Sequence, residues 1–237
     1  MGMKAGDYSS VMMKSRRPTL AEQAYEELGE QIVSGHLPAG RRLLAEELAG
    51  QLAISPTPVK EALSRLEREG LVEAEARRGS MVRRFTRADM DQTYEARLLL
   101  EEHAVRAGFA EGRVTPDFLE RLEAIYAEHM DEIAKQTTEA LAVAIRLDRE
   151  FHELIVSLAG NSLISGWHRI SIRQTQTIRN YSLARYDPKR LEVEHRAIIE
   201  ALRSGEVEQS LAALRFHLDA SLDEFLSRPP EEMPTRG

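Results

Sequence analysis

Four side chains in the second half of the chain have the types needed to bind a metal ion: Asp148, His152, His195 and His217. Asp148 and His152 are four residues apart, so they face the same side of a helix. His195 and His217 fall in two later segments that a helical bundle can bring to the same point. One carboxylate and three imidazoles suit zinc, nickel or another divalent ion. The alternative is chance, because 39 of the 237 residues are acidic and an acid four residues before a histidine arises easily.

A second group of polar side chains, in the first third of the chain, has the types needed to contact DNA. Two short segments with helical apolar spacing cover about 44–52 and 56–69. With Ser55 as the cap of the second, only Ala53 and Ile54 separate them. A turn this short places the second helix outward, where its polar face can enter a major groove. That face carries Thr57, Lys60, Ser64 and Arg65, of which Lys60 and Arg65 are the main expected contacts. The alternative is a set of solvated charges on a compact helical domain.

Residues around this helix are expected to contact the DNA backbone and the minor groove. Ser55 precedes the first turn, where backbone N–H groups and the helix dipole favour a phosphate. Residues 76–80 form a basic hairpin tip, with Gly79 where a positive φ costs little. Arg77 and Arg78 in this tip are expected to reach the adjacent minor groove.

The elements that position this surface are predicted from apolar spacing and turn residues. A first helix covers about 20–35, and two short strands, about 71–75 and 81–84, flank the hairpin tip. Three helices followed by a hairpin predict a winged helix-turn-helix domain over 18–85. A flexible basic arm over 1–17 precedes it.

After residue 85 the pattern changes to long helices only, each opened by a capping residue. The expected helices cover about 87–111, 116–135, 139–159, 162–185 and 188–204, with a last one ending near Leu226. Their expected caps are Thr86, Thr115, Thr138, Asn161 and Asp187. The sequence therefore predicts a mainly α fold, in which an all-α antiparallel helical bundle over 86–228 follows the winged helix-turn-helix. A disordered tail over 229–237 is expected to end it.

Composition and charge limit the class of protein. Residues 1–85 carry 13 Lys and Arg against 12 Asp and Glu, whereas residues 86–237 carry 19 against 27. The acidity therefore lies outside the expected DNA-binding part, which permits that part to approach phosphate. The absence of cysteine excludes disulfides and thiolate metal sites. With no apolar run of about 18 residues and no secretory signal, we expect no membrane association and a cytoplasmic location.

A pattern of apolar, glycine and charged residues runs through the first region. It comprises Tyr25, Leu28, Ile32, Gly35, Leu37-Pro38-Ala39-Gly40, Leu43, Glu47-Leu48-Ala49, the run from Ser55 to Leu63, Leu66, Glu69-Gly70-Leu71-Val72 and Arg78-Gly79-Ser80. This pattern resembles the GntR family of bacterial repressors and implies binding to double-stranded operator DNA. Pro56, Lys60 and Glu46 depart from residues frequent in that family. Since lysine lacks the guanidinium fork that grips guanine in two places, the operator sequence is expected to differ from those of relatives.

The second region carries a resemblance of its own. Its residues are Glu95-Ala96-Arg97, Leu100-Glu101, the run from Asp148 to His152, Ala159-Gly160-Asn161, the run from Glu194 to Ile198, and His217. They resemble the FCD effector domain of the FadR-like subgroup. The resemblance implies that Asp148, His152, His195 and His217 hold a metal, and that a small organic acid is the effector. His103, His129 and His168 have no such match and are expected to be ordinary surface or packing residues.

Two arginines are candidates for contact with the effector. Arg97 can either grip a ligand carboxylate or form a structural pair with Glu101, one helical turn later. Arg173 is the weaker candidate, together with Gln174 and Arg179, and the alternative is a polar stripe that faces solvent.

These predictions combine into a homodimeric regulator, and not an enzyme. Two winged helices related by two-fold symmetry are expected to read an inverted repeat, and the effector is expected to weaken DNA binding, as in a repressor. Two alternatives stay open. The metal itself can be the signal, or the cluster can activate water in a metal-dependent hydrolase. The hydrolase is the weaker alternative because it leaves the winged helix unexplained.

Overall fold

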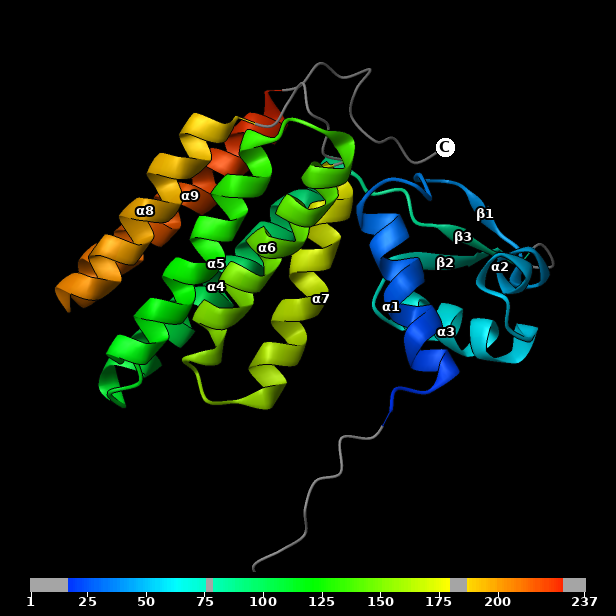
Figure 1. Cartoon of the computed structure of the whole chain (residues 1–237), viewed down its shortest axis with the longest axis horizontal. Coiled ribbons are helices and arrows are strands. Elements are labelled where there is room, and N and C mark those ends of the chain that lie inside the picture. The colour runs from blue at the N-terminus through cyan, green and yellow to red at the C-terminus, as the bar shows by residue number, and fades with distance from the viewer. Residues whose placement is uncertain (1–16, 76–78, 180–186, 228–237) are drawn as a thin grey trace, which may run out of the picture.

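The computed structural model describes residues 17–75, 79–179 and 187–227 (Figure 1). Several predictions lie outside these residues: most of the basic arm, the hairpin-tip residues Arg77 and Arg78, the end of the fourth bundle helix, and the tail.

Three helices and a small sheet form the N-terminal part: α1 (Leu20–Val33), β1 (Arg42–Leu43), α2 (Ala45–Leu52), α3 (Pro56–Arg68), β2 (Val72–Glu75) and β3 (Gly79–Val82). Thr19 and Glu22 form a capping box, in which each side chain accepts the other's backbone N–H, so α1 begins where the sequence indicates. The sheet order is β1-β3-β2, and both pairs are antiparallel. β1 was not predicted, because a two-residue strand is too short to carry an alternating pattern.

The core of this part lies between α1 and α3. Tyr25 and Leu28 of α1 share one buried apolar cluster with Val59 and Leu66 of α3. Val82 of β3 joins the same cluster, so the sheet closes over the helices. The apolar spacing of α1 and α3 therefore fixes the direction in which the polar face of α3 points.

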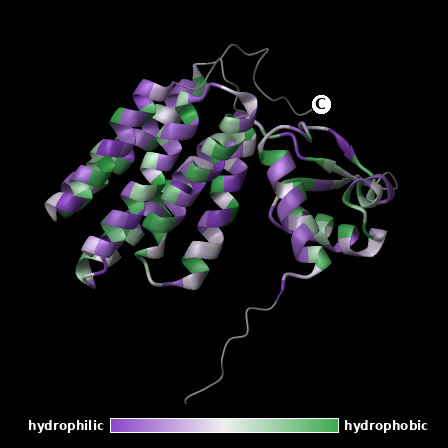
Figure 2. Ribbon diagram, in the orientation of Figure 1, coloured by the Kyte–Doolittle hydropathy of each residue, from purple (hydrophilic) through white to green (hydrophobic). Residues whose placement is uncertain are grey.

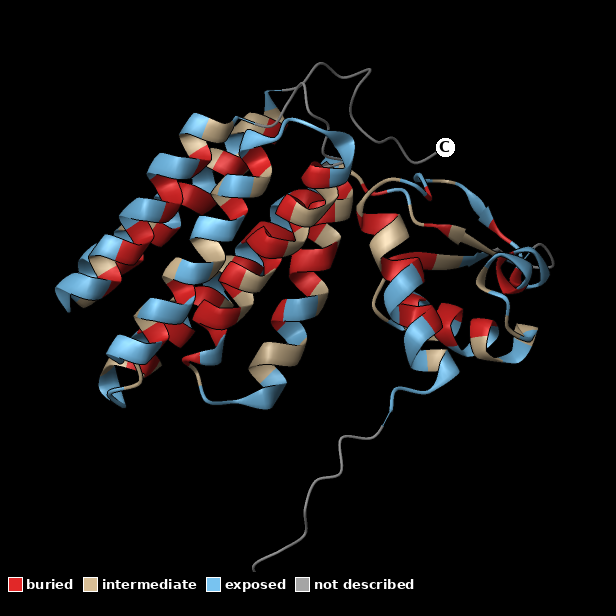
Figure 3. Ribbon diagram, viewed as in Figure 1, coloured by how far each residue is buried: buried red, intermediate tan, exposed pale blue. Residues whose placement is uncertain are grey.

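The C-terminal part is built from six helices in the described residues: α4 (Arg87–Ala110), α5 (Pro116–Ala134), α6 (Thr138–Ser157), α7 (Ser162–Arg179), α8 (Pro188–Ser204) and α9 (Val207–Leu226). α5 packs against α6, and α4 against both α7 and α9, as in an antiparallel bundle. Buried and apolar residues gather on the faces that the helices turn toward one another (Figures 2 and 3). No helix in the described ranges is long and apolar enough to cross a membrane.

Capping residues open most of these helices as predicted. Thr86 accepts the backbone N–H of Asp89, Thr115 that of Phe118, and Asp187 those of Lys189 and Arg190. The predicted cap of α6 was wrong by one residue. Thr137 is the cap, and its hydroxyl accepts the N–H of Ala140 at 3.1 Å, whereas Thr138 is the first residue of the helix.

Candidate metal centre and DNA-reading surface

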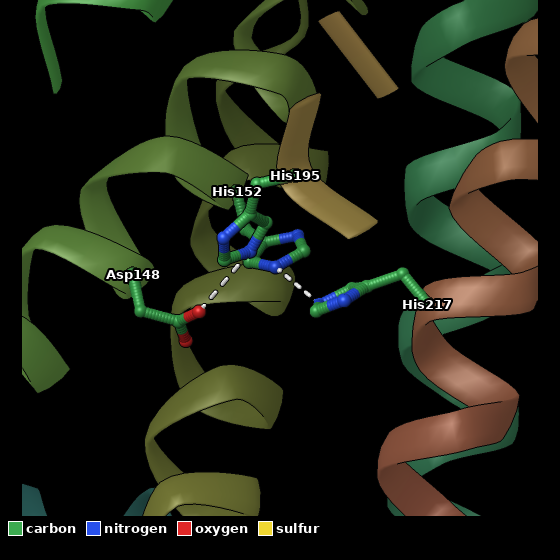
Figure 4. A group of neighbouring side chains, drawn as sticks. All are labelled: Asp148, His152, His195 and His217. Atoms are coloured by element: carbon green, nitrogen blue, oxygen red, sulfur yellow. Dashed lines mark hydrogen bonds and ion pairs between the residues drawn. The ribbon is translucent and has the colours of Figure 1, made fainter. Parts of the chain in front are cut away.

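The four predicted metal ligands meet inside the helical bundle, where we call them the Asp/His cluster. Asp148 and His152 come from consecutive turns of α6, His195 from α8 and His217 from α9 (Figure 4). All four are buried, and one ligand atom from each lies within 4.8 Å of all the others. Ligand atoms around one zinc ion, at about 2.0–2.2 Å from it, lie up to roughly 4.4 Å apart. The cluster therefore needs only small adjustments to coordinate a single ion.

The imidazole nitrogens of the cluster point at one another. His152 Nε2 lies 3.1 Å from His217 Nε2, and His195 Nε2 lies 3.4 Å from Asp148 Oδ1. Within the described residues, neither ring nitrogen of His195 makes a hydrogen bond. Buried polar atoms without hydrogen bonds are costly unless something else satisfies them. A divalent cation fits this donor set, because it binds nitrogen and oxygen lone pairs that receive no hydrogen bond from the protein.

The cluster is in the protonation state that metal binding requires. Burial alone raises the pKa of Asp148, but its contact with His195 and the charge of His152 hold that pKa well below its ordinary value. Burial lowers the pKa of His152, against the opposing effect of Glu101. Burial and the neighbouring His195 hold the pKa of His217 well below its ordinary value. These directions favour an ionised carboxylate at Asp148 and neutral imidazoles at His152 and His217.

Two carboxylates behind the cluster were missed as site residues. Glu101 Oε2 lies 2.8 Å from His152 Nδ1, and Glu194 Oε2 lies 2.8 Å from His217 Nδ1. Both belong to the pattern that resembles the FCD domain, but the sequence predicts a contact only for Glu101, with Arg97. Both contacts join residues on different helices, so no spacing along the chain indicates them.

The remaining bundle histidines differ from one another. His103 is exposed, as an ordinary surface residue would be. His129 is buried, and its ring centroid lies 5.3 Å from that of His195. His168 is also buried, and its Nε2 lies 3.0 Å from Glu101 Oε1. His129 and His168 thus pack directly around the Asp/His cluster and its neighbouring carboxylate.

Arg97 lies beside the cluster and forms the structural pair with Glu101. Its Nε donates to Glu101 Oε1 at 2.9 Å, and the side chain is 5% exposed. Its Nη2 lies 2.9 Å from the same oxygen but makes no hydrogen bond within the described structure. Burial lowers the pKa of Arg97, but the charges of Glu101 and, to a smaller extent, Asp148 raise it above its ordinary value. Arg97 therefore retains a buried Nη2 group with unused hydrogen-bonding capacity.

Arg173 lies elsewhere, which corrects its expected place in the effector site. Its Nη1 donates to the Tyr25 hydroxyl at 2.6 Å, and its Nη2 pairs with Glu26 and Glu30. All three partners belong to α1, in the N-terminal part. The face of α7 that carries Arg173 and Gln174 therefore contacts the N-terminal domain in part, instead of solvent alone. Gln174 donates to the backbone carbonyl of Glu69. The Arg179 side chain lies outside the described residues.

A second arginine joins the two domains from α6. Arg149 Nη2 donates to Glu30 Oε1 at 2.7 Å, and Arg149 Nη1 donates to Gln176 Oε1 at 3.1 Å. Arg149 follows Asp148 directly in the chain. We call the contacts of Arg149 and Arg173 with Tyr25, Glu26 and Glu30 the interdomain network.

The interdomain network lies beside a small apolar cluster, and its Tyr25 hydroxyl both donates and accepts a hydrogen bond. Val33 of α1 packs in one buried cluster with Leu141 and Ile145 of α6. Burial and the hydrogen bond to Glu69 raise the pKa of Tyr25 to about 12, so its hydroxyl stays protonated. That hydroxyl donates to the Glu69 carboxylate at 2.7 Å while it accepts from Arg173.

The predicted DNA-reading residues of α3 divide into two groups. Ser55, Thr57, Lys60 and Ser64 are exposed on one side of the recognition helix. Lys60 Nζ lies 3.3 Å from Glu46 Oε1 of α2. Arg65 differs, because its guanidinium stacks 3.6 Å from the centroid of the Tyr25 ring and pairs with Glu69. At 100° per residue, Arg65 points about 140° away from Lys60, so its expected place on the reading face was wrong.

The strand after the hairpin tip borders the same surface. Gly79 has φ of 94°, the positive value expected of it. Together with Leu44, Glu46, Lys60 and Ser64 it lines a cleft between α2, α3 and β3. This cleft thus lies between α3 and the strand that follows the hairpin tip.

Comparison with known proteins identifies both parts. Residues 20–82 match the family of bacterial regulatory proteins described as the gntR family, and residues 92–220 match the FCD domain. The probable D-xylose utilization operon transcriptional repressor of Paenarthrobacter nicotinovorans is 29% identical, over 87% of this chain and 88% of that protein. The Nta operon transcriptional regulator of Aminobacter aminovorans is 32% identical, over 82% and 89% respectively. Among solved structures, E. coli McbR/YncC has the same fold, with a TM-score of 0.77 at 21% identity over 88% of this chain and 98% of that one.

Proposed function

Because this chain belongs to the GntR family of DNA-binding transcriptional regulators, in the FadR-like subgroup with an FCD domain, we propose that it is a homodimeric repressor controlled by a small carboxylate. The carboxylate binds at a divalent metal held by the Asp/His cluster. Its relatives are transcriptional regulators and not enzymes.

The DNA-binding role rests on the exposed side of α3. Thr57, Lys60 and Ser64 are the proposed contacts in the major groove, and Ser55 at the helix start is the proposed phosphate contact. Arg77, Arg78 and Gly79 remain the proposed wing contacts. Lys60 supplies a single positive charge, and the nearby Glu46 carboxylate repels phosphate, so this surface favours bases over the backbone at that point.

The single observation that carries the metal proposal is the convergence of four buried ligand atoms within 4.8 Å. Asp148, His152, His195 and His217 would hold the ion, with zinc or nickel as the expected identity because the donors are nitrogen and oxygen. When bound, the ion supplies a Lewis acid to which a carboxylate oxygen can bind in an open position.

The chain's own residues would orient the effector and exclude water. Arg97 is buried beside the cluster, and its Nη2 retains hydrogen-bonding capacity for a second carboxylate oxygen. Phe151 packs 4.6 Å from the His195 ring, and the buried rings of His129 and His168 lie nearby. A small acid with one or two carboxylates matches this combination of a cation and an arginine.

Control of DNA binding requires a connection between the site and α1. Asp148 and Arg149 are neighbours on α6, and Arg149 bonds to Glu30 of α1. A ligand that shifts α6 through Asp148 would therefore change the position of the DNA-binding domain. It alters operator affinity only as far as it binds the two arrangements with different affinities.

Dimerisation is proposed on the exposed apolar side chains of adjacent helices. Leu99 of α4, and Leu163 and Trp167 of α7, are each more than half exposed, although α4 and α7 pack together. Two copies joined along such a surface would present two α3 helices to an inverted repeat.

The experiment that tests the proposed function is fluorescence anisotropy with the purified full chain. The DNA is the fragment immediately upstream of its own gene, compared with a scrambled fragment at two salt concentrations, because salt separates phosphate attraction from base reading. We expect tight binding to the upstream fragment with one dimer per two-fold site. Equal binding to both fragments would contradict control of its own gene. A change in affinity on adding metal alone, without any acid, would favour the metal as the signal.

A further inference from the structure

Two buried carboxylates stand directly behind two of the cluster histidines. Glu101 of α4 contacts His152 Nδ1, and Glu194 of α8 contacts His217 Nδ1, each at 2.8 Å. Both carboxylate side chains are at most 2% exposed. In each ring the nitrogen toward the glutamate is Nδ1, and the nitrogen toward the cluster is Nε2. The two histidines thus have the same arrangement, although their glutamates come from different helices.

This arrangement determines where each ring carries its hydrogen. An ionised carboxylate can only accept a hydrogen bond, so each Nδ1 must be the N–H nitrogen. Each neutral ring then has its lone pair on Nε2. The two Nε2 atoms face one another at 3.1 Å, an arrangement in which lone pairs repel unless a cation lies close to both. A divalent ion at the cluster supplies that cation.

We propose that Glu101 and Glu194 are positioning residues of the metal centre, which fix His152 and His217 in the tautomer and orientation that direct Nε2 to the ion. This inference rests on the proposed metal site. Such carboxylate–histidine pairs also raise the basicity of the ligand nitrogen, which strengthens its bond to the metal.

His195 provides an internal contrast. Neither of its ring nitrogens makes a hydrogen bond in the part of the chain that the structure describes. Its ring is instead held by packing, with centroids 4.6 Å from Phe151 and 4.7 Å from His217. Two of the three histidine ligands are therefore held by hydrogen bonds to carboxylates, and the third by its aromatic neighbours.

The two glutamates differ in their other contacts, which decides the choice of variant. Glu101 also accepts from Arg97 Nε at 2.9 Å and contacts His168 Nε2 at 3.0 Å, so its loss disturbs three helices. Glu194 also pairs with Arg190 of its own helix, at 3.5 Å. Glu194→Gln keeps the size and an acceptor oxygen while it removes the charge, so it is the cleaner test.

The experiment measures the zinc affinity of the full chain by competition with a chromophoric chelator. Glu194→Gln and Glu101→Gln are compared with Glu192→Gln and Glu102→Gln, whose carboxylates lie on the same helices and pair with Arg196 and Arg215 away from the cluster. We expect zinc affinity to fall about 10- to 100-fold in the first pair and to stay within about twofold in the controls. A folded Glu194→Gln variant with wild-type zinc affinity would overturn the proposal.

A second readout separates positioning from a purely structural role. Nitrogen-15 NMR of the zinc-bound protein reports which nitrogen of each histidine carries the hydrogen. In the wild type we expect both His152 and His217 to carry the hydrogen on Nδ1. In Glu194→Gln, the signal of His217 should no longer report a hydrogen on Nδ1 alone. An Nε2–H signal from zinc-bound wild-type His217 would overturn the proposal even if affinity falls. If wild-type protein binds no zinc, the proposed metal site fails as well, whereas wild-type binding with an unaffected variant rejects the positioning role alone.

Discussion

Asp148 and Arg149 are consecutive residues of α6, yet they serve two different domains. Asp148 lies in the Asp/His cluster, and Arg149 donates to Glu30 of α1 at 2.7 Å. Adjacent residues of a helix point about 100° apart, so a single helical turn joins a residue of the Asp/His cluster to the DNA-binding domain. Movement of this turn on ligand binding would therefore shift α1 through the contact between Arg149 and Glu30.

The first prediction concerns this connection. Arg149→Met keeps the packing of the side-chain stem but removes both guanidinium hydrogen bonds. We expect metal content and effector affinity to be retained, while the change in operator affinity caused by the effector shrinks by about 0.5–2 kcal/mol. Arg146→Met, on the same helix but paired with Glu150 of α6 itself, is the matched control. An unchanged effector response in Arg149→Met would exclude this turn as the connection.

The second prediction concerns the stability of the interdomain network. Tyr25→Phe and Arg173→Met each remove the contact between the hydroxyl and Arg173 Nη1, and each should lower the free energy of unfolding by about 1–3 kcal/mol. Because the two residues share one hydrogen bond, the double variant should lose less than the sum of the single losses. Urea unfolding of all four proteins measures the coupling. Strict additivity would mean that this hydrogen bond contributes nothing.

The sequence predicts most of the helices, because their caps and apolar spacing depend on residues within a single element. It does not predict contacts between elements that are far apart in the chain. Thr86, Thr115 and Asp187 cap their helices as predicted, because a cap acts on the next three residues. The network around Arg173 joins residues nearly 150 positions apart, so chain spacing carries no sign of it.

At the site, too, the residue types could be predicted from the sequence, but the contacts between helices could not. The Asp/His cluster was predicted by residue type together with family resemblance, whereas Glu101 and Glu194 were not, because their histidine partners lie on other helices. Arg65 was placed on the reading face as one of the polar residues of its helix. Its direction on the helix and the Tyr25 ring beside it place it on the other side.

The third prediction concerns the reading face of α3. Lys60→Ala should weaken operator binding by about 1–3 kcal/mol, since it removes a cation that faces the groove. If Lys60 contacts phosphate, the dependence of affinity on salt should also fall by about one ion. Glu46→Gln should strengthen binding, because it removes a repelling carboxylate 3.3 Å from Lys60. Anisotropy titrations measure both, with Lys135→Ala on α5 as a control away from the reading face. Equal loss in Lys60→Ala and Lys135→Ala would argue against a direct contact.

The fourth prediction concerns pH. Burial and the neighbouring His195 lower the pKa of His129 to about 3. In the unfolded chain this pKa is about 6.5. Below pH 6.5, approximately, the unfolded state therefore binds a proton that the folded state does not, so stability falls as the pH falls toward 3. The lowered pKa values of His152 and His217 act with the same sign.

Urea unfolding of chelator-treated protein at pH 7.5 and pH 5.5 tests this. His129→Gln removes one titrating group, so its loss of stability between the two pH values should be smaller than that of the wild type by about 1.4 kcal/mol. His103→Gln is the control, because His103 is exposed. Identical losses in wild type and His129→Gln would show that His129 takes up a proton in the folded protein.

The central claim is that an organic acid acts on DNA binding through the metal at the Asp/His cluster. The most direct test is the affinity for the upstream DNA fragment, measured during titration with a series of small mono-, di- and tricarboxylic acids. Metal-loaded wild type, chelator-treated wild type and metal-loaded His195→Ala are compared. The account predicts that at least one acid weakens DNA binding by wild type only when metal is loaded, and that His195→Ala binds DNA normally but does not respond. An equal response in all three proteins would contradict it, because the acid would then act without the metal.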